Sequence, residues 1–143
     1  MILNSIDIKQ YLKFGGLKIT PDLLENQYQQ NGIDLILEKT EKLVLGYAGF
    51  TLGVTREFLE LPNDLMAFVQ IRSSWARMGF MLPPTVVDAG FKGTLTLEIV
   101  KFGESIELPI RERFVHLIFA KLSNPSEPYN GKYQNQVDIT HAR

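Results

Sequence analysis

A short segment in the second half of the chain decides the fold class. It reads TLTLEIVK (residues 94–101), so threonine or glutamate alternates with leucine or isoleucine over most of its length. Because successive side chains of a β-strand point to opposite faces, this alternation predicts a strand whose Leu95, Leu97 and Ile99 face a core. The two threonines and Glu98 then lie on the opposite, polar face.

Short segments of β type recur along the chain, separated by turns rich in glycine and proline. Besides 94–101, the expected strands cover residues 34–37, 43–47, 50–54, 66–71 and 113–122. A helix is expected at residues 7–14, where Asp7 and Gln10 have the form of a capping box and Gly15 ends the helix. Many short strands without long helices indicate a mainly β barrel or sandwich.

The composition bounds the size of the protein and its partners. With 143 residues and 45% hydrophobic content, we expect a single domain over residues 1–143. Lysine and arginine number 15 against 16 acids, and a net charge of -1 gives no long-range field that would attract nucleic acid or an anionic membrane. A bound phosphate must therefore be held by local groups.

Cysteine and histidine usage bears on metal sites and on the compartment. The chain has no cysteine, which excludes disulfides and thiolate chemistry and is consistent with a reducing cytosol. Its two histidines, His116 and His141, lie in unrelated segments, so we expect no protein-bound metal and read His116 as a core or interface residue. Without a signal peptide or a long apolar span, we expect a soluble, cytoplasmic protein.

The C-terminal residues 123–143 differ in composition from the rest of the chain. They are rich in serine, asparagine, proline, glycine, tyrosine and glutamine, and they show no apolar period. Such a segment is typical of a flexible arm, which we expect to fold over a ligand or a neighbouring subunit.

The sequence RSSWAR (residues 72–77) is a candidate anion site. Ser73 and Ser74, entering one helical turn, offer two hydroxyls and free backbone N–H groups, and Arg72 and Arg77 bring positive charge. This combination fits a triphosphate cradle. It equally fits an ordinary capped turn with solvated arginines, in which Trp75 contributes packing.

Two carboxylates follow in different settings. Asp88 lies in the turn sequence VVDAGFKG, and Glu98 lies on the polar face of the next expected strand. Carboxylates in different surroundings can divide roles, one orienting a substrate and one moving protons. Taken alone, their spacing fits a turn aspartate and a solvent-facing glutamate better.

Six segments in order resemble the dCTP deaminase family, a branch of the trimeric dUTPase superfamily. The matching segments are 1–9, 30–35, 58–64, 72–74, 87–98 and 128–136. The resemblance implies a dUTPase-like distorted jelly-roll β-barrel with a short N-terminal helix. It also implies a homotrimer with active sites between subunits, and an arm at 123–143 that closes over the nucleotide.

The resemblance also implies an activity, which is hydrolytic deamination of dCTP to dUTP with release of ammonia and without metal catalysis. Glu98 matches the glutamate that activates the water attacking carbon 4 of cytosine. Arg77 matches the arginine beside it, and Ser73 matches a serine of the same cluster. Asp88 matches the residue that contacts the deoxyribose 3′-hydroxyl, and in dUTPases also positions the water that attacks the α-phosphate.

The remaining matches concern nucleotide binding. Arg72 and Ser74 fall where the family holds phosphate oxygens, and Phe91 takes the aromatic position against the sugar. Tyr129, Lys132 and Gln136 belong to the closing arm. Magnesium is implied as a companion of the triphosphate, held mainly by phosphate oxygens and water.

Two alternatives stay open. The first is a monofunctional dUTPase, which hydrolyses dUTP to dUMP and pyrophosphate through Asp88; a deaminase that also has this dUTPase activity belongs to the main interpretation. The segment 78–87, which lies where the family reads the base, is shorter than in bacterial relatives, whereas Glu98 favours deamination because pure dUTPases generally carry an apolar residue there. The second is a catalytically silent nucleotide-binding or regulatory protein.

Overall fold

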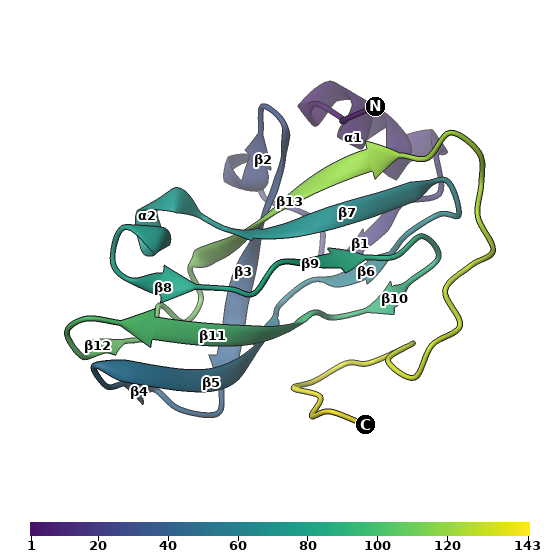
Figure 1. Cartoon of the computed structure of the whole chain (residues 1–143). Helices are drawn as coiled ribbons and strands as arrows, with labels where there is room; N and C mark the ends of the chain where they lie inside the picture. The colour runs from purple at the N-terminus through teal and green to yellow at the C-terminus, as the bar shows by residue number, and fades with distance from the viewer.

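The computed structural model describes all residues, 1–143, and its regular secondary structure consists mainly of antiparallel strands (Figure 1). Its elements are α1 (Ser5–Phe14), β1 (Lys18–Thr20), a 3-10 helix (Glu25–Gln27), β2 (Tyr28–Gln29), β3 (Gly32–Thr40), β4 (Val44–Leu45), β5 (Ala48–Thr55), β6 (Phe58–Glu60), β7 (Leu65–Ile71), α2 (Ser73–Ala76), β8 (Phe80–Met81), β9 (Thr85–Val87), β10 (Lys92–Gly93), β11 (Thr96–Phe102), β12 (Ile106–Glu107) and β13 (Arg113–Lys121). The predicted mainly β class is confirmed.

The largest sheet curls into an open barrel. Its strand order is β8-β11-β5-β3-β13-β7-β9, and β2 pairs with β3. The two edge strands, β8 and β9, are joined by a linker of only Leu82, Pro83 and Pro84. Because a chain spans at most about 3.5 Å per residue, the two edges lie within about 14 Å of each other, so the sheet bends round on itself.

The side chains of the strand predicted at 94–101 point to the two faces as expected from residue 95 onward. Along β11, Leu97 and Ile99 are buried while Glu98 is half-buried on the other face. Thr94 departs from the prediction: it precedes the strand and is buried, because the C-terminal tail pairs with its backbone. The buried apolar side chains form one continuous core inside the barrel, reaching from Ile8 on α1 to Phe119 on β13.

The N-terminal helix begins earlier than the sequence suggested. Its cap is Asn4, whose side chain accepts a hydrogen bond from the Asp7 backbone, and the Asp7 side chain accepts one from the Asn4 backbone. The predicted capping box was therefore misplaced: Asp7 is its third helical residue, not its cap. Gly15 ends the helix as expected.

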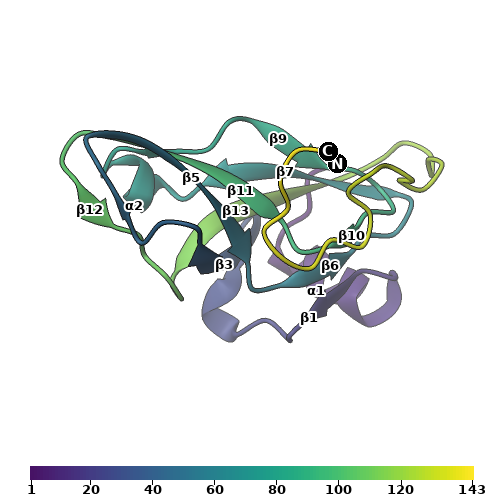
Figure 2. The same ribbon diagram turned by 90° about the horizontal axis from the view of Figure 1, so that it is seen from below.

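The C-terminal tail runs back along its own chain. Figure 2 shows it as a yellow loop beside β10 and β11. Tyr129 donates its backbone N–H to the carbonyl of Ala89, and Asn135 donates to Lys92. A side chain on Gly90 would lie 2.6 Å from Cα of Pro128, so this close crossing requires glycine. No helix in the structure has both the length and the apolar character to span a bilayer.

Candidate active site

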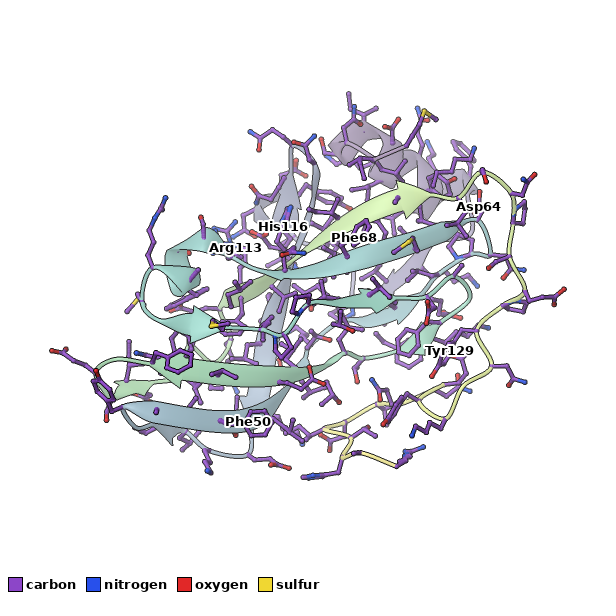
Figure 3. The ribbon with its side chains drawn as sticks, in the orientation of Figure 1. Phe50, Asp64, Phe68, Arg113, His116 and Tyr129 are labelled. Atoms are coloured by element: carbon purple, nitrogen blue, oxygen red, sulfur yellow. The ribbon has the colours of Figure 1, made fainter.

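One cavity lies where the open barrel meets the C-terminal tail. It has a volume of about 630 Å³, and its walls come from β5, β9, β11 and the tail. Most lining residues are apolar, and among them Phe50 on β5 and Tyr129 in the tail are labelled in Figure 3. Apolar walls with a few polar groups are typical of small-molecule sites.

Glu98 enters this cavity from β11. The strand register places it beside Leu52 of β5, which also lines the cavity. Glu98 is half-buried, and its carboxylate has no hydrogen bond or ion pair within the chain. A carboxylate without a partner, beside apolar walls, is free to bind a ligand or to exchange a proton.

Asp88 reaches the same cavity from the turn after β9. The turn is closed by a hydrogen bond from the Phe91 backbone N–H to the Asp88 carbonyl, 3.1 Å long. The Asp88 side chain is exposed and also has no partner in the chain. The structure therefore brings Asp88 and Glu98, the two carboxylates singled out from the sequence, to one cavity.

The aromatic and amide residues predicted for the nucleotide line this cavity as well. Phe91 packs edge-to-face against Tyr129, with ring centroids 5.7 Å apart. Gln136 donates through its side-chain amide to the carbonyl of Thr94, 2.8 Å away. Lys132 does not line the cavity: it is exposed, and its amine donates to the carbonyl of Arg143.

The turn at 72–77 lies elsewhere in the protomer. It forms α2, between β7 and β8, and none of Arg72, Ser73, Ser74 and Arg77 lines the cavity that holds Glu98. Arg72 is held by the buried carboxylate of Asp34, whereas the two serines and Arg77 are exposed. The expected cluster of Ser73, Arg77 and Glu98 is not formed within one chain.

Trp75 has the packing role that the sequence suggested. Its ring lies against Phe80 and Phe114, with both centroid distances 6.2 Å. Its indole N–H donates to the Arg113 carbonyl, 2.8 Å away, which ties α2 to β13.

Several cavity residues escaped the sequence reasoning. Leu52 is found only when the pairing of β5 with β11 is known. Thr140 and His141 line the cavity from the end of the tail, and the Thr140 N–H donates to the Thr96 hydroxyl, 3.0 Å away. The tail carried no signal for these contacts beyond its arm-like composition.

Comparison with known proteins identifies the family. The family model described as dCTP deaminase-like matches residues 36–122. The chain belongs to the dCTP deaminase-like family. It is 42% identical to the dCTP deaminase of Sulfurisphaera tokodaii, over 98% of this chain and 91% of that protein. It is 43% identical to the probable deoxyuridine 5′-triphosphate nucleotidohydrolase of Sulfolobus islandicus rod-shaped virus 1, over 100% of this chain and 99% of that protein.

Solved structures agree on the fold. The 2′-deoxycytidine 5′-triphosphate deaminase of Agrobacterium tumefaciens matches with a TM-score of 0.70 at 22% identity, over 82% of this chain and 47% of that chain. This chain thus spans about half of that one. Staphylococcus phage dUTPases match with TM-scores of 0.60 and 0.59. The predicted dUTPase-like barrel with a short N-terminal helix is confirmed.

Proposed function

We propose that the protein deaminates dCTP to dUTP. Water adds to carbon 4 of cytosine, the bond from carbon 4 to the amino nitrogen breaks, and ammonia leaves. The observation that carries the proposal is the partnerless carboxylate of Glu98 in an apolar cavity, in a family member about 40% identical to proteins named dCTP deaminase.

Four cavity residues and Lys132 of the tail have roles in this proposal, besides Glu98. Glu98 takes a proton from the attacking water and returns one to the leaving ammonia. Asp88 binds the 3′-hydroxyl from the cavity rim, and Phe91 packs against the sugar. The tail, through Tyr129 and Gln136, covers the nucleotide, and Lys132 turns toward the terminal phosphate when the substrate binds.

We further propose that the active site is completed by another copy of the chain in a homotrimer. Ser73, Ser74 and Arg77 are exposed and away from their own cavity, so they are available to a neighbouring one. The outer face of β7 and β13 supports association: Phe68 and Ile118 are paired across the two strands and incompletely buried. An apolar band of this kind is typical of a protein interface.

Magnesium enters this proposal with the substrate. No three histidine, aspartate or glutamate side chains of the chain converge on a point that could hold a metal ion. Magnesium is commonly bound by substrate phosphates, water and one or two carboxylates, which suits a cavity with Asp88 at its rim. Among proteins of this fold, the phage phi11 dUTPase coordinates a structural Mg(II) ion. The ion would neutralise charge on the triphosphate.

A product assay tests the activity. Purified protein is incubated with magnesium and either dCTP or dUTP, and dUTP, dUMP, ammonia and pyrophosphate are measured. Conversion of dCTP to dUTP with ammonia supports deamination, and dUMP from dCTP indicates that both activities are present. Binding of dCTP and dUTP without turnover of either would instead favour the silent nucleotide-binding alternative.

The role of Glu98 is tested by Glu98→Gln, which keeps the size of the side chain but cannot accept the proton. Loss of general acid and base catalysis lowers kcat for ammonia release by about 10²- to 10⁴-fold. The matched control is Glu104→Gln, the same change at an exposed glutamate outside the cavity. Ammonia release by Glu98→Gln at the rate of the control would reject the assignment.

A second candidate function is hydrolysis of dUTP to dUMP and pyrophosphate. It is favoured by the viral relative, which is similar over its whole length and named as a probable dUTP nucleotidohydrolase. In that reaction Asp88 positions the attacking water, and Asp88→Asn abolishes dUMP formation. Three results together identify a dUTPase. The protein produces dUMP from dUTP, it releases no ammonia from dCTP, and Glu98→Gln leaves the rate of dUMP formation unchanged.

Mixing two inactive variants tests the shared site. Glu98→Gln and Arg77→Ala each remove one side of a site built between subunits. If mixed trimers form by exchange of subunits, some sites combine an intact Glu98 with an intact Arg77, and part of the activity returns. A mixture that exchanges subunits and stays inactive contradicts a site built in this way.

A further inference from the structure

Asp34 holds three basic side chains at the end of β13 next to α2. It is 2% exposed, and its Oδ2 forms an ion pair with Nε of Arg72 at 2.9 Å and accepts a hydrogen bond from Nη1 of Arg113 at 3.3 Å. Its Oδ1 lies 3.0 Å from Nδ1 of His116. Because a carboxylate only accepts, this ring nitrogen carries the hydrogen. Figure 3 shows Arg113 and His116 close together and away from Tyr129, which lines the cavity.

The cluster carries an excess of positive charge. Two guanidinium groups share one carboxylate oxygen, so the group has a net positive charge even with a neutral histidine. The side chains of Arg72 and Arg113 are 27% and 31% exposed. Each uses its Nη1 on a backbone carbonyl, whereas neither Nη2 group has a hydrogen-bond partner in the chain. Two pairs of N–H donors are therefore available to a ligand.

Holding the turn in place does not require the second arginine. Arg72 and Asp34 already form a neutral pair, and the indole N–H of Trp75 already binds the Arg113 carbonyl. Bringing another guanidinium to the same oxygen adds repulsion between like charges, and a bound anion relieves this repulsion. The exposed hydroxyls of Ser73 and Ser74 follow Arg72 directly in the sequence.

We propose that Arg113 is a second anion-binding residue, which together with Arg72 binds the phosphate chain of the nucleotide, while Asp34 positions both guanidinium groups. The identity of the anion as a triphosphate rests on the proposed function. Guanidinium groups suit it because their planar N–H pairs match two phosphate oxygens at once. His116 fixes the orientation of Asp34, and its ring lies against Gly32.

Titration with inorganic tripolyphosphate tests the proposal without a base or a sugar. The variant is Arg113→Gln, and the matched control is Arg111→Gln, an exposed arginine nearby whose side chain has no hydrogen bond or ion pair. Loss of a charge-assisted contact weakens binding about tenfold in Arg113→Gln. The control removes the same charge, and its affinity stays within about twofold of the wild type at an ionic strength of about 0.15 M.

Three results would overturn the proposal: no tripolyphosphate binding by the wild type, an unchanged affinity in Arg113→Gln, or equal losses in Arg113→Gln and Arg111→Gln. If Arg113→Gln does not fold, Arg113→Lys replaces it. That variant keeps the charge but loses the planar fork, so its affinity also falls, and an unchanged affinity contradicts the proposal. Thermal midpoints, measured alongside, separate a lost contact from lost folding.

Kinetics separate this inference from the proposed function. A role in phosphate binding raises the KM for dCTP in Arg113→Gln while kcat changes little. If dCTP is deaminated and Arg113→Gln has the KM of the wild type, the inference fails and the function stands. If tripolyphosphate binding depends on Arg113 but neither dCTP nor dUTP is turned over, the inference stands and the function fails.

Discussion

Four carboxylates of this protein lie in two regions that differ in their hydrogen-bond partners. Asp34 on β3 and Glu57 in the turn after β5 are almost fully buried, and every side-chain oxygen of both accepts a hydrogen bond. In the cavity, Glu98 is half-buried and Asp88 exposed, and neither side chain has a partner. The satisfied carboxylates connect strands, and the unsatisfied ones are left free for chemistry.

The contrast predicts different responses to the same substitution. Asp34→Ala removes the shared partner of two arginines and lowers the free energy of unfolding by about 3 kcal/mol. The loss is at the lower end for a buried ion pair because the guanidinium groups of both arginines partly reach solvent. Glu98→Ala removes no bond, and it changes the free energy of unfolding by less than about 0.5 kcal/mol. Urea denaturation of both variants measures the difference. Equal destabilisation would remove the distinction between the regions.

Glu57 provides a pH-dependent test of the first region. Burial raises the pKa of Glu57 above its usual value, although hydrogen bonds from the Ile36 backbone and the Gln27 amide act in the opposite direction. The native state thus holds this proton more tightly than the unfolded chain. The contribution of Glu57 is largest below its usual pKa and declines as pH rises toward the raised value.

Two variants isolate this contribution. Glu57→Gln cannot ionise. As pH rises from the usual pKa of glutamate through the raised pKa of Glu57, the wild type therefore loses stability relative to this variant. Glu57→Ala leaves the Ile36 N–H without its acceptor and removes one of the two acceptors of the Gln27 amide, and it costs about 2 kcal/mol. Denaturation curves across the acidic to neutral range check both statements. A difference between wild type and Glu57→Gln that is independent of pH would contradict the raised pKa.

Local patterns in the sequence predicted what depends on local geometry. The facing of Glu98 follows from the two-residue period of its own strand, and the structure has it as predicted. The capping box failed because Asn4 with Asp7 and Asp7 with Gln10 both fit the pattern, and only the docking of α1 selects the first. The 43–47 segment likewise shortened to Val44–Leu45.

Long-range pairings were outside the reach of local patterns. Leu52 lies beside Glu98 through the register of β5 on β11, and Arg72 meets Asp34 because β3, β13 and β7 are neighbours. A single sequence contains no direct record of either pairing. The site was therefore predicted as separate pieces: Asp88 and Glu98 meet in one cavity, while the turn at 72–77 lies apart from it.

Asp64 is intermediate in burial and hydrogen bonding between the buried carboxylates and those of the cavity. It is half-buried and accepts one hydrogen bond, 2.9 Å long, from the hydroxyl of Tyr11 on α1. Burial, together with this bond, raises the pKa of Tyr11 to about 12. Tyr11→Phe removes one hydrogen bond and lowers the free energy of unfolding by about 1 kcal/mol. Thermal unfolding of Tyr11→Phe and of the control Tyr47→Phe, an exposed tyrosine, checks this value.

The smallest expected effect on stability concerns an exposed carboxylate, Asp138. Asp138 in the tail pairs with Lys39 at 2.9 Å, and the hydrogen bond from Lys39 lowers the pKa of Asp138 below its usual value. The pairing is present at neutral pH and is lost as pH falls through the lowered pKa. Because both side chains are exposed, Asp138→Asn leaves the thermal midpoint unchanged.

The pair should instead affect the local mobility of the tail. The backbone N–H of Thr140, which binds the Thr96 hydroxyl at the cavity, exchanges severalfold faster with solvent in Asp138→Asn. Salt at about 0.5 M screens the exposed pair and has the same effect on the wild type, but little effect on the variant. Exchange at Thr140 that responds to neither change would show that the Thr96 contact alone holds the tail against the cavity.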